Sequence, residues 1–448
     1  MKIVFLPIDN RPVCYQLPEM IAKINNDIEL VLPPIEWLGN LTKASDIENL
    51  MSWLSRFADS ADAIVLSLDT IAYGGLINSR RSAESFETIK LRLERLKNII
   101  KASNAKVYAF SSVMRISNNN INQEEKEYWN VYGKDIFKYS YECDKYGAAE
   151  TQVPAEIIAD YLATRKRNFN INKLYLEWQR EGLFKSLIFS KDDCSEFGFN
   201  IREARELSKL GGCVKTGADE IPLVLLSKVV NLPVKIFPIF LEPDYKDLIS
   251  NYEDISIEQS VLNQIEAADC IVVNSRDEAD VLLVVNNFKN HQGEIVMKSD
   301  TELYDGIWPE PDKPYIIADV RNANGSDNNF VKKLFEKGLS DLFLGYSGWN
   351  TSANTIGSLI CEMKYALYAK KNFNFNRKAF LSVQATRFMD DWAYQANVRQ
   401  QLSVPNTDDI SVRMKPYMVE IKDALKFDFN VKYSFPWSRL FEVKVELI

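Results

Sequence analysis

The chain has 448 residues, of which 46% are hydrophobic, 12% aromatic and 26% charged. Single hydrophobic cores stop growing at about 250–300 residues, so the length predicts two folded domains, and the composition excludes a disordered chain. The net charge of −8 gives no global basic field of the kind that a duplex nucleic-acid binder presents, so we expect no nucleic-acid partner.

Short apolar runs alternate with helical patterns along most of the chain, which predicts parallel sheets built from βαβ units. The predicted strands cover residues 3–6, 30–32, 63–68, 107–110, 186–189, 213–214, 234–241, 281–285, 315–318 and 342–344. After residue 350 the pattern changes to helices, which we expect at about 352–370, 375–402 and 408–426. A period-two alternation at 441–445 predicts a terminal edge strand.

The number of candidate strands bears on the fold, because ten strands exceed the eight of a barrel. A helical segment at 151–185 also breaks the rhythm of alternating units. We therefore expect an α/β fold with two doubly wound, flavodoxin-like parallel sheets, and an elaborated (β/α)8 barrel is the alternative. The expected division is an N-terminal domain over 1–230 with a helical insertion near 120–185, a second α/β domain over 231–372, and a helical region over 373–448.

The cysteines and the N-terminus bear on the compartment. Six cysteines are scattered without a C-x-x-C pair, which is typical of free thiols in a reducing environment. Pro7 and Asp9 interrupt the first apolar run before a signal-peptide core could form, and no run approaches the roughly 20 apolar residues of a membrane span. We expect a cytoplasmic protein with no membrane partner.

A single histidine, His291, limits the available chemistry. It excludes a zinc site with two histidine ligands, and it allows a Ser-His-Asp triad only if His291 itself serves. Because His291 lies in the polar loop 287–294, we interpret it as an exposed residue. Phosphate-binding glycine motifs are absent too, so we expect no cofactor, and proton transfer falls mainly to carboxylates.

Charged residues follow the predicted strands, where a parallel sheet binds its ligands. Seven carboxylates, four arginines, two tyrosines and a tryptophan occupy these positions. Turn formation, helix capping and ion pairing are competing explanations for each of them. The residues that we expect to bind substrate are Asp9, Arg11, Asp69, Tyr73, Arg80, Arg115, Asp219, Glu220, Asn324, Trp349, Asn350 and Asn354.

Asp192 and Asp193 are the most specific indication of a catalytic site, because two adjacent carboxylates follow the strand at 186–189. We expect their mutual repulsion to raise the pKa of one, which could then act as an acid while the other stays charged. Ligation of a divalent cation and capping of a following helix remain alternatives. Trp349 offers an apolar platform for a sugar ring, so glycoside hydrolysis is the favoured chemistry.

Five motifs support a family resemblance: LPIDNRPV at 6–13, SLDTIAYGGLINSR at 67–80, KDD at 191–193, GADE at 217–220 and YSGWNTSANTIG at 346–357. In content and order they resemble a bacterial family catalogued as domain of unknown function 4127. The resemblance implies that the protein comes from a group found in bacteria that handle varied carbohydrates. The adjacent acids are also similar to the acidic pair of substrate-assisted N-acetylhexosaminidases, in which one carboxylate orients the acetamido group and its neighbour is the general acid.

Three functional hypotheses follow. The first is a glycoside hydrolase-like enzyme with catalytic Asp192 and Asp193, a small carbohydrate ligand, N-acetylhexosaminides as candidate substrates, and a cleft that gathers strand ends from both halves of the chain. The second is a divalent-metal enzyme for a phosphorylated or acidic small molecule, with Asp9 and Asp69 among its ligands and arginines holding the anion. The third is a sugar-binding protein without catalysis.

Near the C-terminus, Arg387, Asp390 and Asp391 have spacings at which they can pair on one helix face. We interpret this group as structural, and a lid over the site is the alternative.

Overall fold

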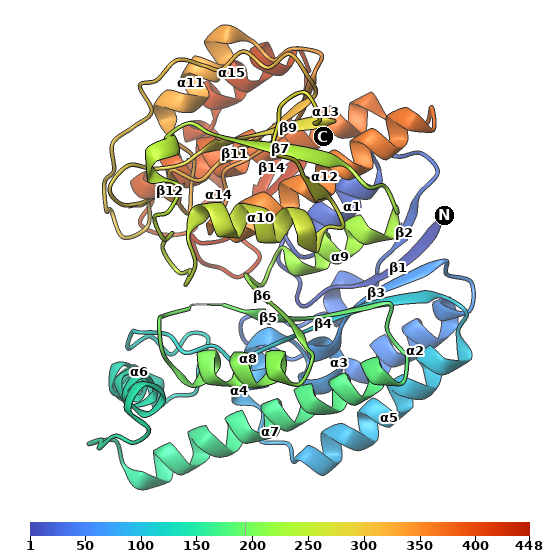
Figure 1. The fold of residues 1–448 in the computed structure, drawn as a ribbon, viewed down its shortest axis with the longest axis vertical. Helices are drawn as coiled ribbons and strands as arrows, with labels where there is room; N and C mark the ends of the chain where they lie inside the picture. The colour runs from blue at the N-terminus through green and yellow to red at the C-terminus, as the bar shows by residue number, and fades with distance from the viewer. Residues whose placement is uncertain (193) are drawn as a thin grey trace. The chain divides into compact units, whose positions relative to one another are not determined.

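The computed structural model describes residues 1–192 and 194–448 (Figure 1). They form two compact units. The first comprises residues 1–10, 29–225 and 252–254, and the second comprises residues 11–28, 226–251 and 255–448. Each unit is built around its own parallel sheet.

The sheet of the first unit has six strands, all pairing in parallel in the order β2-β1-β3-β4-β5-β6. This order is that of a flavodoxin-like doubly wound sheet with one strand added. The central strands are apolar and fully buried, as a sheet covered on both faces requires. The strands are β1 (Lys2–Leu6), β2 (Glu29–Val31), β3 (Ala63–Ser67), β4 (Lys106–Ser112), β5 (Ser186–Lys191) and β6 (Cys213–Thr216).

Helices connect these strands, and α5 and α7 run side by side next to the sheet (Figure 1). The long connection between β4 and β5 holds α6 and α7, where the sequence predicts a helical insertion. Trp129 and Ile136 of α6 pack there with Tyr161 of α7. The helices are α2 (Ile47–Ala58), α3 (Leu68–Tyr73), α4 (Leu76–Arg81), α5 (Phe86–Ala102), α6 (Trp129–Tyr146), α7 (Ala155–Arg180), α8 (Phe199–Lys209) and α9 (Ile221–Val229), with the short η1 (Ile35–Trp37) before α2.

The sheet of the second unit has five parallel strands in the order β13-β11-β9-β7-β8, which is the flavodoxin-like order. They are β7 (Lys235–Phe240), β8 (Ile271–Val272), β9 (Val281–Asn286), β11 (Tyr315–Asp319) and β13 (Phe343–Ser347). A short ladder joins β10 (Gly293–Glu294) to β12 (Asn322–Ala323). The helices of this part are α1 (Gln16–Ala22), η2 (Pro243–Tyr245), α10 (Ile257–Ala267), α11 (Asn328–Lys337) and α12 (Ser352–Lys371).

The C-terminal part is mainly helical, with two departures from the sequence prediction. The expected helix at 375–402 consists of α13 (Arg377–Arg387), a π-helix η3 (Phe388–Val398) and the short η4 (Arg399–Gln401). The expected helix at 408–426 is divided at Met414 into α14 (Thr407–Arg413) and α15 (Lys415–Leu425), next to Pro416, whose ring nitrogen cannot donate a hydrogen bond. The terminal strand β15 (Lys444–Leu447) pairs antiparallel with β14 (Val431–Ser434).

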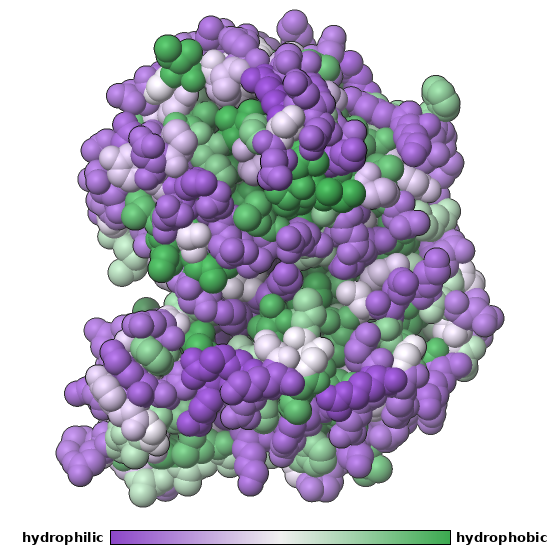
Figure 2. All heavy atoms as spheres, in the orientation of Figure 1, coloured by the Kyte–Doolittle hydropathy of each residue, from purple (hydrophilic) through white to green (hydrophobic). Residues whose placement is uncertain are grey.

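The two sheets confirm the predicted doubly wound fold, and the barrel alternative is wrong because the strands form two separate open sheets. The division at residues 230 and 372 remains a prediction. None of the helices in the described part of the chain combines the length and the apolar content that a membrane crossing requires. On the face drawn in Figure 2, hydrophilic side chains predominate and hydrophobic ones gather in patches.

Candidate functional site

In the first unit, the predicted strand-end residues lie at one edge of the sheet. Asp9 follows β1, Asp69 follows β3, Asp192 follows β5, and Asp219 and Glu220 follow β6. Because all six strands are parallel, their carboxyl ends share this edge. Asp9, Asp69, Asp219 and Glu220 are buried. Burial of four carboxylates at one edge is costly unless each is hydrogen-bonded or charge-compensated, which makes this edge the first candidate site.

The ends of β5 and β6 bring two sequence motifs together. The backbone N–H of Gly217 donates to the carbonyl of Lys191 (2.9 Å), which closes a bridge between the two strand ends. Gly217 has φ +103°, and a Cβ atom at this position would lie 1.8 Å from Oε1 of Glu220. The carboxyl group of Glu220 therefore folds over Gly217, beside the peptide group that precedes Asp192.

Asp254 adds a further carboxylate to this corner. It forms an ion pair with Lys191 and accepts a hydrogen bond from Thr216 Oγ1 (3.2 Å). Lys191 and Thr216 are the last residues of β5 and β6. The segment around Asp254 is thereby tied to the same two strand ends as Glu220.

Asp192 faces an arginine from the neighbouring strand end. Its Oδ2 lies 3.8 Å from Nη1 of Arg115, whose Nη2 also pairs with Glu124 (2.8 Å). The side chain of Asp192 is 28% exposed, so solvent can reach it. The second member of the predicted catalytic pair, Asp193, lies outside the described residues.

Asp69 is held at the ends of β3 and β4. Its Oδ1 accepts from Ser111 Oγ (2.7 Å) and its Oδ2 from the backbone N–H of Ser112 (2.9 Å). Burial raises the pKa of Asp69, and these hydrogen bonds partly offset that effect. Asp69 is thus a buried carboxyl group that is anchored by its neighbours.

Two other predicted residues of this unit are enclosed by their surroundings. Tyr73 is buried, and the guanidinium of Arg167 lies 5.4 Å from its ring centre. Arg80 is buried and donates to Glu125 Oε1 (2.6 Å). Both side chains therefore contact other charged residues of this unit, Arg167 and Glu125.

In the second unit, the predicted residues mostly shape loops. Asn350 adopts φ +60° and accepts the backbone N–H of Asn324 (2.9 Å), which itself has φ +62°. Asn354 donates from Nδ2 to the Oγ1 of Thr351, the N-cap of α12. The guanidinium of Arg11 lies 5.2 Å from the ring centre of Trp437.

The carboxyl edge of the second sheet is organised by Asp319, a strand-end residue that the sequence analysis did not select as a site residue. Asp319 is fully buried and accepts from Asn286 Nδ2 (2.8 Å), from the backbone N–H of Asp327 (2.8 Å) and from Tyr346 Oη (2.9 Å). These partners come from β9, β13 and the start of α11. Burial, followed by the charge of Asp327, raises the pKa of Asp319 to about 7.

Arg321 fills the position at which a flavodoxin-like sheet usually binds its ligand, between the ends of its first and third strands. Its side chain is fully buried, donates to Asn286 Oδ1 (3.0 Å) at the end of β9, and pairs with Glu242 Oε1 (2.7 Å) after β7. An internal ion pair thus spans this crevice in the second unit.

Among the described residues no ion pair within 4 Å joins Arg387 to Asp390 or Asp391, although the charge of Arg387 acts against the raised pKa of both aspartates. Arg387 instead donates to Ser358 Oγ (2.8 Å) and lies 3.9 Å from Glu362 Oε2. The two aspartates belong to the π-helix, where the spacing of side chains differs from that of an α-helix.

Asp390 and Asp391 are adjacent acids, of which Asp391 is buried and holds the segment after β13 in place. Asp391 Oδ2 accepts from the backbone N–H of Gly348 (2.8 Å), and Asp390 Oδ1 accepts from Gln395 Nε2 (3.0 Å). Burial, followed by the charge of Asp391, raises the pKa of Asp390. Both aspartates and Trp349 line a cavity of about 40 Å³, which is too small for a sugar ring.

Sequence reasoning missed Glu362 and the hydrogen-bond partners of Asp319. Glu362 is fully buried within α12, and burial raises its pKa to about 8. The sequence signal that could have identified Glu362 is its charge within the largely apolar part of the helix predicted at 352–370. Tyr346 belongs to a strand whose residue pattern gives no hint of its hydrogen bond to Asp319.

Within residues 1–192 and 194–448, no group of three or more histidine, cysteine, aspartate or glutamate side chains is arranged to hold a metal ion.

The fold and the edges define a two-unit α/β protein with flavodoxin-like sheets and a carboxylate-rich strand edge. Its sequence matches the model of the family described as protein of unknown function, DUF4127, over residues 3–446, so the chain belongs to that family. A comparison with curated proteins gives no match.

The contact between Gly217 and Glu220 can be tested by substitution. Gly217→Ala should destabilise the protein more than Gly211→Ala, by about 1–3 kcal/mol, because the new methyl group must displace the Glu220 carboxyl. Gly211 is the matched control, since it also has positive φ (+89°) but open space around its Cβ position. The measurement is chemical denaturation of both variants. Equal losses would show that Glu220 does not occupy this place.

The raised pKa of Asp319 predicts a pH-dependent stability. Between about pH 4 and 7 the folded state holds a proton that the unfolded state has released, so this contribution is full below about pH 4 and is lost as the pH rises through 7. Asp319→Asn should therefore reduce the fall in unfolding free energy between pH 5 and 7, by up to about 1.4 kcal/mol per pH unit.

The matched control is Asp312→Asn, because a hydrogen bond from Arg276 lowers the pKa of this exposed carboxylate and it does not titrate in that range. Denaturation curves at several pH values give the slopes. An unchanged slope for Asp319→Asn would contradict the assignment.

Proposed function

We propose that the chain is a glycoside hydrolase-like enzyme that uses carboxylates at the edge of the six-stranded sheet. The observation that supports this most is the corner between β5 and β6, where Glu220 folds over Gly217 beside the segment that contains Asp192. Glycoside hydrolysis needs two carboxyl groups near one bond and needs no histidine. A chain with one histidine is suited to that chemistry.

Different surroundings give the carboxyl groups different roles. Asp192 is partly exposed and lies 3.8 Å from the guanidinium of Arg115, so it can meet a ligand. Glu220 is fully buried beside Gly217, and in this proposal it takes the role of general acid. In this proposal Asp193 is the further candidate for acid or base, as the sequence predicts.

Asp9, Asp69 and Asp219 complete the proposed sugar site. All three are buried at the same edge, and carboxylates there can accept hydrogen bonds from sugar hydroxyl groups. N-acetylhexosaminides are the candidate substrates, because an adjacent carboxylate can orient an acetamido group. Arg11, Trp349 and the asparagines of the second unit extend this site only if both units act on one ligand, which remains a prediction.

Turnover of aryl glycosides tests the proposal. The full-length protein should release the aryl group from at least one member of a panel of α- and β-linked substrates, including N-acetylhexosaminides. Asp193→Asn and Glu220→Gln should each lower kcat/KM by about 100-fold or more, because each removes a group that transfers a proton.

Asp135→Asn is the control, because it neutralises an exposed carboxylate on α6. Circular dichroism and melting curves establish that each variant folds. Binding of the sugars without any turnover would instead favour the non-catalytic sugar-binding hypothesis. Full activity of both site variants would refute the assigned roles.

A second candidate is a divalent-metal enzyme acting on a phosphorylated or acidic small molecule. The observation in its favour is the set of buried carboxylates at the same edge, since Mg²⁺ and Ca²⁺ prefer oxygen ligands. Asp9, Asp69, Asp192 and Asp193 are its proposed ligands, and the described members of this set would have to move closer together to hold one ion. Arg11, Arg80 and Arg115 would hold the anion, although Arg80 and Arg115 already form ion pairs with glutamates.

A thermal-shift experiment separates this candidate from the first. Added Mg²⁺ or Ca²⁺ should raise the melting temperature by several degrees if the metal binds the folded state, and a chelator should reverse the shift. Asp69→Asn should abolish it. The glycosidase proposal predicts no such metal-dependent shift.

A further inference from the structure

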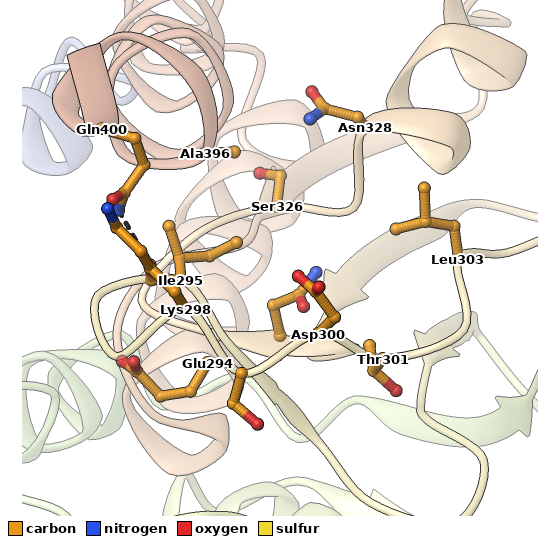
Figure 3. Close-up of a pocket in the computed structure, with 12 residues that line it drawn as sticks. Glu294, Ile295, Lys298, Asp300, Thr301, Leu303, Ser326, Asn328, Ala396 and Gln400 are labelled. Atoms are coloured by element: carbon orange, nitrogen blue, oxygen red, sulfur yellow. Dashed lines mark hydrogen bonds between the residues drawn. The ribbon is translucent and has the colours of Figure 1, made fainter.

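A second cavity, of about 380 Å³, lies in the second unit next to the short ladder of β10 and β12, whose residues Glu294 and Asn322 line it (Figure 3). Its walls come from the loop after β10, the loop between β12 and α11, and the end of the π-helix. Gln400 Nε2 donates to the carbonyl of Ile295 (2.8 Å), which ties the C-terminal side of the cavity to the loop after β10. Asn324 Nδ2 donates to Glu294 Oε1 (2.5 Å) and holds the start of that loop. The volume falls within the range of small-molecule sites.

Ser326 lines this cavity, and its hydroxyl group is held by a buried network. Its Oγ lies 2.6 Å from Tyr346 Oη, which in turn lies 2.9 Å from Asp319 Oδ2. Its backbone N–H donates to the carbonyl of Asp391 (3.1 Å). The arrangement requires Gly348, because a Cβ atom there would lie 2.7 Å from Ser326 Oγ. A chain of hydrogen bonds from a buried carboxyl group therefore orients this hydroxyl.

Asn328 presents an oriented donor to the same space. Its Oδ1 accepts from Trp392 Nε1 (2.9 Å) and from Asn397 Nδ2 (2.7 Å), both on the π-helix. These two bonds fix the amide plane, and no hydrogen bond to another described residue involves Nδ2. In Figure 3, Asn328 and Ser326 lie on the same side of the cavity.

The composition of the walls indicates the kind of ligand. Glu294 and Asp300 contribute negative charge and Lys298 contributes positive charge, so the walls carry a formal charge of −1, which disfavours an anion such as phosphate. The described residues that line the cavity include no aromatic side chain, which disfavours a planar ring. Hydroxyl, amide and carboxylate groups remain, and they match a ligand with many hydroxyl groups.

We infer that this cavity is a second binding site, for a neutral polyhydroxylated small molecule such as a monosaccharide, with Ser326 and Asn328 as its fixed polar contacts. The inference concerns the second unit by itself and does not depend on catalysis at the six-stranded sheet. Its failure and the failure of the proposed function are therefore separate outcomes.

Calorimetric titration of the full-length protein tests the inference, with glucose, galactose, N-acetylglucosamine and xylose as neutral probes and inorganic phosphate as the charged one. At least one sugar should bind. Asn328→Asp should weaken that binding at least tenfold, because it replaces the free donor with an acceptor but keeps the oxygen that Trp392 and Asn397 use. Ser326→Ala should also weaken it at least tenfold.

The matched control is Asn329→Asp, because Asn329 is the exposed neighbour of Asn328 on α11 and does not line the cavity. This variant should bind like the wild type. The inference is overturned if no sugar binds, if Asn328→Asp and Asn329→Asp bind alike, or if phosphate binds and the same variants abolish its binding. Loss of aryl-glycoside turnover in Asp193→Asn with sugar binding intact would support two independent sites.

Discussion

Parallel strand pairing is the constraint on which the rest of the structure depends. In both units every strand of the main sheet runs in the same direction, so the residue after each strand arrives at one edge. This brings Asp9 and Glu220, which are distant in sequence, to a common edge of the six-stranded sheet. Backbone geometry thus gathers the carboxylates, and local contacts decide how each is held.

Burial is the second constraint, because a carboxylate removed from water must find hydrogen bonds or lose its charge. Asp69 and Asp319 meet this requirement with donors from neighbouring strands, and both retain a raised pKa. Raised carboxyl pKa values are useful in a chain with one histidine, because they let aspartate and glutamate exchange protons near neutral pH. A carboxyl group that is fully enclosed, such as Glu362 in α12, is subject to the same effect of burial but has a structural role.

Much of the fold could be predicted from the sequence, because strands and helices differ in their hydrophobic period. All ten predicted strands form, and the helical insertion lies between β4 and β5. The two-residue strand β8 was missed because Ile271–Val272 is too short to show a period. The π-helix was missed because its apolar pattern resembles that of an α-helix, and the break at Met414 depends on tertiary packing as well as on Pro416.

The candidate site was predictable in part. Strand-end position identified Asp9, Asp69, Asp192 and Glu220 as members of one edge, because that inference needs only the strand direction. The fold of Glu220 over Gly217 could not be foreseen, since it depends on a positive φ angle and a bridge to Lys191. The network of Asp319 joins residues that are far apart in sequence, and only coordinates bring them together.

The proposed function places a carboxylate-based sugar site at the carboxyl edge of the six-stranded sheet. A crystal structure of the chain with a non-cleavable aryl thioglycoside tests it most directly. The account predicts a sugar ring within hydrogen-bonding distance of Glu220 and of the segment that holds Asp192 and Asp193. A structure in which the saturating ligand leaves this edge empty would contradict it.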